Sequence, residues 1–355
     1  MNFVIEKTVL ENILQNLQPF LEKKDTSQIT SHIYLSADTN KLYAKATDYE
    51  IGLSIETTSI EVIENGSITA NGKKLLDIVR ILKDEKVELK FEKDNLFIKQ
   101  KKSNFKLPTF KSSEYPAFVN IEDKSNISID THLLIDSLRK ITPAADTNNP
   151  KFSLNGTLID IKESNINFVA TDTRRLALVS FETTNESELS IIIPKKAIIE
   201  MQKLFNENSK IYYDNTYLIV ESETSIFFTK LINDKYPDYN RIIPKDTSKN
   251  IELSKSSITS ALKQISTISQ DIKITIDSNS ILFESLSDDN IEAKTSIEIE
   301  NGLTQPFILA FNSRYMLDFL SHISTDNFTL HANESNQPFF LQDSNFKTII
   351  MPIVI

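Results

Sequence analysis

The chain has 355 residues and carries 39 Lys+Arg against 49 Asp+Glu, which gives a formal net charge of -10. This length predicts two or three domains, and a hydrophobic content of 40% excludes wholesale disorder. The absence of Cys excludes a disulfide framework and a thiolate zinc site, and only 5 Gly leave little material for a Gly-rich phosphate loop. No apolar run approaches the ~20 residues of a membrane helix. We expect a cytoplasmic protein without a membrane partner, and the acidic balance ordinarily argues against nucleic acid.

An internal repeat organises the chain. Segments 3–14, 127–138 and 251–262 align at a constant offset of 124 residues, and their apolar positions coincide. Each copy has the pattern of a short alternating strand, a polar cap and a helix with apolar residues at i, i+4 and i+7. Thr131 and Ser254 are the predicted N-cap residues. The first helices of the three copies are therefore predicted at 7–24, 131–140 and 254–265.

A second amphipathic helix recurs in each copy, over 72–83, 195–205 and 312–322. The copies align on an acidic residue, which is Asp77, Glu200 or Asp318, and each has a basic residue four positions earlier. The first two copies also share a short motif that follows an alternating strand. Its members are Ala46-Thr-Asp48 and Ala170-Thr-Asp172, again 124 residues apart.

Short alternating or β-branched segments separated by Asn, Asp and Ser connect the helices, as is typical of strands and tight turns. Each copy therefore has two helices and roughly eight strands in about 110–120 residues, a usual domain size. We predict an α+β fold of three tandem similar domains, each with two helices packed on β-sheets. The predicted bounds are 1–122, 127–246 and 250–355.

Patterns typical of enzymes are missing from the sequence. None of the four His has metal-ligand spacing, and neither an H-E-x-x-H nor a G-x-S-x-G motif occurs. The Asn71-Gly-Lys-Lys stretch continues into Leu, so it is not a phosphate-binding Walker motif. Asp48 and Glu50 leave a catalytic carboxylate pair open as an alternative, although solvated loop charge explains them better. We predict a non-enzyme without metal or cofactor.

Charge is divided unevenly along the chain. The six predicted helical segments together carry +9, so the remainder carries -19. Lysines on solvated helix faces would explain this without any function. If six equivalent helices share one surface, however, that surface is basic and could contact phosphates independently of base sequence.

Three segments resemble the bacterial DNA sliding clamp, the beta subunit of DNA polymerase III: Ala170-Thr-Asp-Thr-Arg-Arg-Leu-Ala177, Lys230-Leu-Ile-Asn-Asp-Lys-Tyr-Pro-Asp-Tyr-Asn-Arg-Ile-Ile-Pro244 and Ile350-Met-Pro-Ile-Val-Ile355. The resemblance covers the whole chain. It implies the DNA-clamp fold, in which two subunits join head to tail and close a ring. Helices line the hole through which double-stranded DNA passes, and the ring tethers the replicative polymerase for processive synthesis.

The resemblance also implies three sets of site residues. Short linear peptides from the DNA polymerase III catalytic subunit, the clamp loader, other polymerases and repair proteins would bind at Leu154, Thr171, Thr173, Arg174, Arg175, Leu176, Pro237, Ile242, Tyr315, Ile349, Met351, Pro352 and Ile353. The implied DNA-facing residues are Lys24, Lys73, Lys151, Lys195 and Lys196, and the implied homodimer interface residues are Phe105, Leu107 and Ile268.

The sequence departs from the family at two positions. Thr173 replaces a frequent Gly, and Val354 stands where an Arg is usual. Two other classes of function remain as alternatives. An enzyme with an Asp/His site lacks any supporting spacing. A repeat-built protein-interaction scaffold without DNA encirclement explains the repeat but not the division of charge.

Overall fold

A computed structural model describes residues 1–25, 27–185, 187–205, 208–286, 291–301 and 303–355. The chain divides into two compact units. Unit 1 contains residues 1–135 and 199–231, and unit 2 contains residues 136–198 and 232–355. Each unit is described by itself below.

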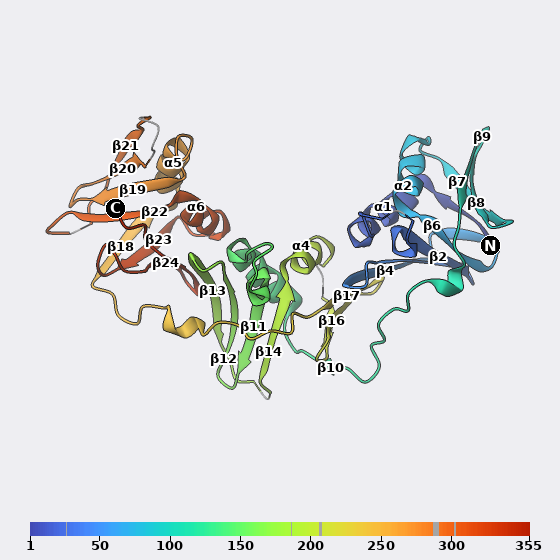
Figure 1. Cartoon of the computed structure of the whole chain (residues 1–355), viewed down its shortest axis with the longest axis horizontal. Helices are drawn as coiled ribbons and strands as arrows, with labels where there is room; N and C mark the ends of the chain where they lie inside the picture. The colour runs from blue at the N-terminus through green and yellow to red at the C-terminus, as the bar shows by residue number, and fades with distance from the viewer. Residues whose placement is uncertain (26, 186, 206–207, 287–290, 302) are drawn as a thin grey trace. The chain divides into compact units, whose positions relative to one another are not determined.

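The structure contains a helix at each of the six predicted places (Figure 1). The first is shorter than the predicted 7–24, since α1 ends at Leu17 and Pro19, which lacks a backbone N–H, lies in the 3-10 turn that follows. The apolar faces of the helices are buried, as the spacing predicts. In α1, for example, Leu10, Leu14 and Leu17 are buried, and in α6 Met316, Phe319 and Leu320 are buried. The helices are α1 (Lys7–Leu17), α2 (Gly72–Ile81), α3 (Thr131–Ile141), α4 (Lys195–Leu204), α5 (Lys255–Ile265) and α6 (Ser313–His322).

The two predicted N-caps have different outcomes. Ser254 is the N-cap of α5, where its hydroxyl accepts a hydrogen bond from the Ser257 N–H at 3.5 Å. The prediction for Thr131 is wrong, since α3 begins at Thr131 and the Asp130 carboxylate accepts from the Leu133 N–H at 2.9 Å. The Thr131 hydroxyl instead exchanges hydrogen bonds with the backbone of Ser209. This hydroxyl is therefore occupied by a residue distant in sequence.

Unit 1 contains two antiparallel sheets among its described residues. The five-stranded sheet has the order β5 (Ile60–Glu64), β1 (Asn2–Glu6), β7 (Lys86–Glu92), β8 (Asn95–Gln100) and β9 (Ser103–Pro108). The eight-stranded sheet has the order β10 (Ser125–Asn126), β15 (Lys210–Tyr213), β16 (Tyr217–Glu221), β17 (Ser225–Lys230), β4 (Ile51–Thr57), β3 (Lys41–Thr47), β2 (His32–Asp38) and β6 (Gly66–Asn71).

Unit 2 likewise contains an eight-stranded and a four-stranded antiparallel sheet within the described ranges. The eight-stranded sheet has the order β14 (Leu189–Pro194), β11 (Gly156–Lys162), β12 (Asn165–Thr171), β13 (Arg175–Glu182), β25 (Phe346–Ile350), β24 (Phe339–Asp343), β23 (Asn327–Ala332) and β18 (Lys249–Ser254). The four-stranded sheet has the order β21 (Lys294–Glu298), β20 (Ser280–Ser285), β19 (Asp271–Ile276) and β22 (Phe307–Asn312).

Both eight-stranded sheets join strands from neighbouring sequence repeats. In unit 1, β4 of the first repeat pairs with β17 of the second, with Leu53 opposite Phe227. In unit 2, β13 of the second repeat pairs with β25 of the third, with Leu176 opposite Ile349. Because backbone ladders cross the repeat boundaries, the compact units do not coincide with the sequence repeats. The predicted domain bounds stay a prediction.

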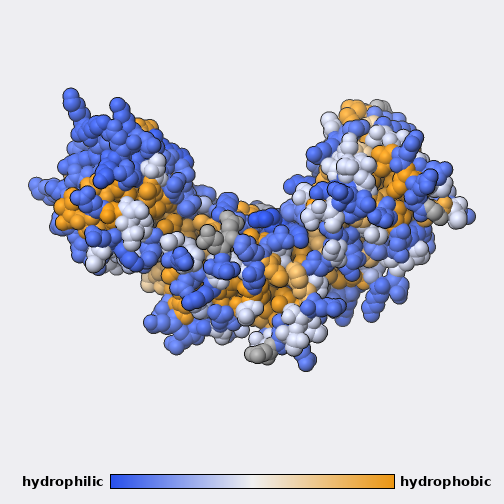
Figure 2. Space-filling model, turned by 180° about the vertical axis from the view of Figure 1, so that it is seen from behind, coloured by the Kyte–Doolittle hydropathy of each residue, from blue (hydrophilic) through white to orange (hydrophobic). Residues whose placement is uncertain are grey.

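Aromatic side chains fill the cores between helices and sheets. In unit 1, Phe20 packs edge-on against Phe227, with ring centroids 6.0 Å apart. In unit 2, Phe319 of α6 stacks on Phe346 of β25 at 5.0 Å. The face shown in Figure 2 has both hydrophilic and hydrophobic areas. These aromatic contacts tie the segment that follows α1, and α6, to sheets that two repeats share.

Candidate functional site

A tight loop between β12 and β13 is the centre of the candidate site. The Thr171 hydroxyl donates to the Arg175 carbonyl at 2.6 Å and accepts from the Thr173 N–H at 3.2 Å. The Asp172 carboxylate accepts from the backbone N–H groups of Arg174 and Arg175, at 3.0 and 2.9 Å. The loop thereby satisfies its own polar groups and leaves Thr173 and Arg174 exposed.

The first repeat builds the same loop between β3 and β4. The Thr47 hydroxyl donates to the Ile51 carbonyl at 2.8 Å, and the Asp48 carboxylate accepts from the Ile51 N–H at 3.0 Å. Even the left-handed residue recurs, with φ 71° at Tyr49 and 75° at Thr173. The shared Ala-Thr-Asp motif therefore predicts a real structural repeat. The loops differ in that Arg175 replaces Ile51.

The Arg175 side chain is buried and fully engaged. Only 7% of it is exposed, and its Nε–H donates to the Asp172 carboxylate at 3.1 Å. One terminal nitrogen donates to the Asp318 carboxylate of α6 at 2.6 Å, and the other donates to the Pro143 carbonyl in the 3-10 turn η4 (Thr142–Ala144). The guanidinium carbon lies 4.5 Å from the ring centroid of Tyr315. Arg175 thus connects the loop of the second repeat to the helix of the third.

The C-terminal tail completes the site. The Met351 N–H donates to the Arg174 carbonyl at 2.9 Å, and the Ile353 N–H donates to the Ala310 carbonyl of β22 at 2.7 Å. Met351 is 38% exposed, and Pro352 and Ile353 are half-buried. The tail therefore lies between the loop and β22 with an apolar side chain facing solvent. We call the exposed or half-buried side chains of Thr173, Arg174, Tyr315, Met351, Pro352 and Ile353 the loop–tail surface.

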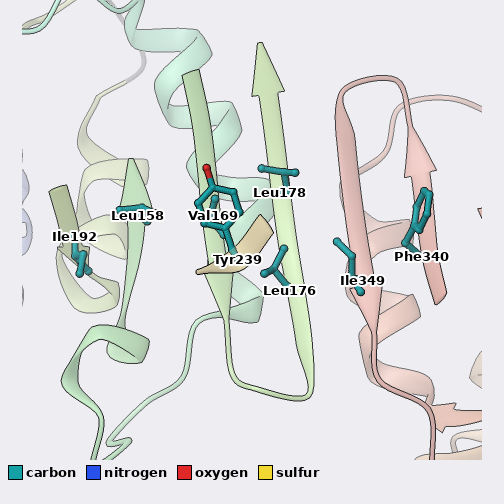
Figure 3. Close-up of a cluster of buried hydrophobic side chains, with 8 residues drawn as sticks. All are labelled: Leu158, Val169, Leu176, Leu178, Ile192, Tyr239, Phe340 and Ile349. Carbon is teal, nitrogen blue, oxygen red and sulfur yellow. The ribbon is translucent and has the colours of Figure 1, made fainter. Parts of the chain in front are cut away.

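An apolar cluster lies on the sheet that carries the loop. Its side chains come from strands of both the second and the third repeat (Figure 3). Tyr239 lies over this sheet; its hydroxyl donates to Asp160 at 2.8 Å and accepts from the Asn167 amide at 3.1 Å. Burial, followed by the Asp160 carboxylate, raises the Tyr239 pKa to about 12. The cluster contains Leu158, Val169, Leu176, Leu178, Ile192, Tyr239, Phe340 and Ile349.

The remaining predicted peptide-binding residues differ in burial and lie on different elements. Leu176 and Ile349 are buried in the apolar cluster. Leu154 is buried in the 3-10 turn η5 (Phe152–Asn155), where its carbonyl accepts from the Asp146 N–H rather than from the loop. Pro237 is half-buried and Ile242 is 36% exposed, and they flank the short turn η6 (Tyr239–Arg241).

Sequence reasoning assigned no role to Asp172, Asp318 and Tyr239, although they hold the site together. Asp172 lies inside the quoted loop motif, and Asp318 is the acidic position of the repeated second helix. Their recurrence was therefore a usable signal. Nothing in the sequence indicated that Asp318, 143 residues away, would contact Arg175.

The predicted DNA-facing lysines lie in both units. Lys24, Lys73, Lys151 and Lys196 are exposed, and Lys73 lines a pocket beside Asp77 and Arg80. Lys195 is half-buried, and its ammonium donates to the Ala145 carbonyl at 2.6 Å. Burial, followed by the nearby Arg175 charge, lowers the Lys195 pKa. The Lys195 ammonium group is therefore already engaged in a hydrogen bond within unit 2.

The predicted interface residues lie near sheet edges or helix ends. Phe105 and Leu107 occupy alternate positions on β9, which is an edge strand of the five-stranded sheet; Phe105 is half-buried and Leu107 is buried. Ile268 follows α5 and is 41% exposed. An edge strand offers a free row of backbone donors and acceptors for pairing with another chain.

Among the residues that the structure describes, no group of His, Asp and Glu could hold a metal ion. Likewise, no helix in the described part of the chain is long and apolar enough to cross a membrane.

Comparisons with known proteins agree over the full chain. Family models of the DNA polymerase III beta subunit match in order: the N-terminal domain at 1–119, the central domain at 128–238 and the C-terminal domain at 240–354. The beta sliding clamp of Helicobacter pylori is 39% identical, with 100% of each chain covered. The beta sliding clamp of Caulobacter vibrioides is 29% identical, with 99% of this chain and 100% of the relative covered.

Comparison with a solved structure also identifies a sliding clamp. A crystal structure of the Helicobacter pylori beta clamp bound to a DNA ligase peptide has a TM-score of 0.94 and 39% identity, with 100% of each chain covered. The resemblance drawn from the three quoted segments is thereby confirmed. The chain belongs to the family of the DNA polymerase III beta subunit, the bacterial sliding clamp.

Proposed function

We propose that this chain is one subunit of a DNA sliding clamp, a non-catalytic processivity factor for DNA polymerase III. Two copies join head to tail into a ring, duplex DNA passes through it, and the ring holds the polymerase on its template. The observation that carries the proposal is the end-to-end match of three family domains in order, from residue 1 to residue 354. The bacterial cytoplasm is the corresponding location.

A ring suits this function for a physical reason. A head-to-tail interface whose rotation closes produces a finite ring. The ring remains on DNA by topology, so its phosphate contacts can be weak, uniform and independent of sequence, which permits sliding. We assign these contacts to Lys24, Lys73, Lys151, Lys195 and Lys196.

The ring joint would use the exposed edge of β9. A strand edge accepts a partner strand through main-chain hydrogen bonds, while alternate side chains give specificity. The half-buried Phe105 would supply such a side chain in one subunit with the buried Leu107 packed behind it on the same strand, and Ile268 would contribute from the other. The alternation on β9 and its free edge support this assignment.

Partner proteins would bind at the loop–tail surface through short linear peptides. The Helicobacter pylori relative is solved with a DNA ligase peptide. In this chain the exposed Met351 and the half-buried Tyr315 and Ile353 offer apolar contact beside the Arg174 charge. Such a surface suits a peptide with Leu and Phe anchors. The partners are the polymerase catalytic subunit, the clamp loader, other polymerases and repair proteins.

Retention on DNA of different topology tests the proposal. The chain is loaded onto nicked circular DNA with the clamp loader and ATP, and the circle is then cut once. We expect a dimer of 40.5 kDa subunits that stays on the circle and leaves after cutting, unless the new ends are blocked. Equal retention on circular and cut DNA, or a monomer, would favour the protein-interaction scaffold instead.

A further inference from the structure

Lysine is concentrated at one end of the five-stranded sheet of unit 1. Residues 99–111, which span the end of β8, all of β9 and the segment that follows, contain five Lys and no Asp or Glu. The chain as a whole has a net charge of -10. These lysines lie outside the helices α1 to α6. The positive charge of the helices therefore does not account for them.

The strands β7, β8 and β9 lie side by side and sort their side chains onto two faces (Figure 1). On β8, Leu96 and Ile98 are buried in the core, whereas Phe97 and Lys99 are half-buried. On β9, Lys106 is exposed. Because successive side chains of a strand point to opposite sides of a sheet, Phe97 and Lys99 share the face that is turned away from the core.

The register of the sheet places Phe97 among lysines. Phe97 lies directly opposite Lys90 of β7 and directly opposite Lys106 of β9. Residues that lie opposite each other on antiparallel strands have Cβ atoms about 4.5–5.5 Å apart. Lys99 is two positions along the same strand, and so on the same face. Three lysine side chains therefore surround a partly exposed aromatic ring. We call Lys90, Phe97, Lys99 and Lys106 the Phe97–lysine face.

Two of the three lysines on this face keep their charge unpaired. Lys90 pairs with Glu92 at 3.3 Å, and Glu88 lies opposite Lys99 in the register. No ion pair in the part of the chain that the structure describes involves Lys99 or Lys106. The Phe97–lysine face thus combines a ring that water can reach with positive charge that no carboxylate neutralises.

This combination fits a chain in which bases and phosphates alternate. Single-stranded nucleic acid stacks its bases on aromatic side chains while its phosphates contact Lys and Arg, and every base has a face that can stack. An acidic peptide would match the charge but has no base to stack on Phe97. Duplex DNA hides the faces of its bases inside the helix. The pairing of ring and charge therefore favours an unpaired strand.

We infer that the Phe97–lysine face is a binding surface for single-stranded nucleic acid, with Phe97 as the stacking platform and Lys99 and Lys106 as phosphate contacts. The inference goes beyond the proposed function, since it requires neither a ring nor duplex DNA and uses none of the lysines assigned to the duplex. It also leaves the ring joint in place, because pairing at the edge of β9 uses main-chain groups, whereas this face presents side chains.

Fluorescence anisotropy of a labelled oligothymidylate about 12 nucleotides long tests the inference on the full chain. Phe97→Leu stays apolar but removes the ring, so we expect roughly tenfold weaker binding. Phe97→Tyr keeps a ring and should bind within about twofold of the unchanged chain. Lys99→Gln with Lys106→Gln should lower the slope of log affinity against log salt concentration by about 1.4, since each phosphate contact to a single strand contributes about 0.7.

The control removes the same charge elsewhere. Lys235 and Lys245 are exposed lysines of unit 2 that lie outside its helices. Lys235→Gln with Lys245→Gln should leave both the affinity and the slope unchanged. Circular dichroism checks that each variant is folded, and sedimentation checks that each keeps the oligomeric state of the unchanged chain, since β9 also carries the proposed ring joint.

The remaining outcomes would overturn the inference. Unchanged affinity of Phe97→Leu would mean that no base stacks on this ring, and equal losses in the two lysine pairs would leave net charge as the only cause. A polyglutamate peptide that binds as tightly as the oligothymidylate, and is weakened equally by the Lys99 and Lys106 changes, would make the face a docking surface for acidic protein segments. A chain that binds no oligothymidylate would overturn the inference, while retention on circular DNA would still support the sliding clamp.

Discussion

Thr173 holds a backbone conformation that L-residues with branched side chains rarely adopt. Its φ is 75°, and the corresponding Tyr49 has φ 71°. The frequent Gly of the family at this position has a direct explanation, since Gly reaches φ > 0 without a steric penalty. The resemblance to the family indicated the substitution, and the positive φ of Thr173 explains why it is strained.

We expect Thr173→Gly to stabilise the protein. Relief of left-handed strain contributes about 1–2 kcal/mol, and the greater freedom of Gly in the unfolded chain costs about 0.5–1 kcal/mol. The net gain is about 0.5–1 kcal/mol, measured as a higher midpoint of chemical denaturation. Tyr49→Gly should change the midpoint in the same direction, and Thr173→Ala, which keeps a Cβ, should gain less than either. A lower midpoint for Thr173→Gly would contradict the argument.

Single residues also mark the limit of sequence reasoning. Arg175 was predicted to be in the site, because the resemblance to the clamp family implied it. Its buried contacts with Asp318 and Pro143 depend on packing between distant segments, which no local pattern encodes. Lys195 shows the same limit. Its position at the start of a helix predicts an exposed side chain, but its ammonium group donates a hydrogen bond to the Ala145 carbonyl.

At the scale of elements, the helices were predictable and the strand partners were not. Apolar periodicity alone determines which face of α1 or α6 is buried. Strand pairing across repeats, such as β4 with β17, requires knowing which sheet edge is free. The short apolar run Ile226-Phe-Phe228 fits several partner strands equally well. Therefore the repeats were visible in the sequence and the shared sheets were not.

Gly156 tests how closely two strands must approach. It begins β11 opposite Pro194 of β14, and a Cβ added there would lie 2.5 Å from the Ile193 carbonyl oxygen. Backbone atoms cannot move aside cheaply, so we expect Gly156→Ala to lower the free energy of unfolding by about 1–3 kcal/mol. Thermal unfolding followed by circular dichroism measures the change.

Gly72 is the matched control for Gly156. A Cβ there would lie 2.4 Å from the Leu21 Cδ1, which is the end of a flexible side chain. Because Gly72 also begins α2, Ala would gain up to about 1 kcal/mol of helix propensity. Gly72→Ala should therefore cost less than Gly156→Ala. The reverse order would show that side-chain crowding, rather than strand approach, dominates.

For the whole molecule, the net charge of -10 hides an uneven distribution. The segments that the sequence predicts to be helical carry +9 and the rest of the chain carries -19. Acidic segments repel DNA, whereas basic helices attract its phosphates. The net charge alone would have argued against DNA, which the family binds. The internal repeat made it possible to assign the positive charge to the helices and the negative charge to the rest of the chain.

Reversing the charges of Lys24, which lies beyond the end of α1, and of Lys73 at the start of α2 tests this division. The double variant Lys24→Glu with Lys73→Glu reverses two side-chain charges in each subunit, and therefore four in a ring of two subunits. Each lost lysine–phosphate contact removes about 0.9 from the slope of log affinity against log salt concentration. Direct binding of the free dimer to linear duplex should therefore weaken roughly tenfold or more, with a slope smaller by about 3–4.

The control makes the same charge change elsewhere. Lys93 and Lys210 are exposed, at the β7–β8 turn and at the start of β15. The double variant Lys93→Glu with Lys210→Glu alters the net charge of the ring by the same amount. If general repulsion governs binding, both double variants should therefore weaken DNA binding to the same degree. A change in slope confined to the Lys24 and Lys73 pair locates the phosphates near these two lysines. Equal effects would mean that net charge alone governs DNA binding and that no basic face exists.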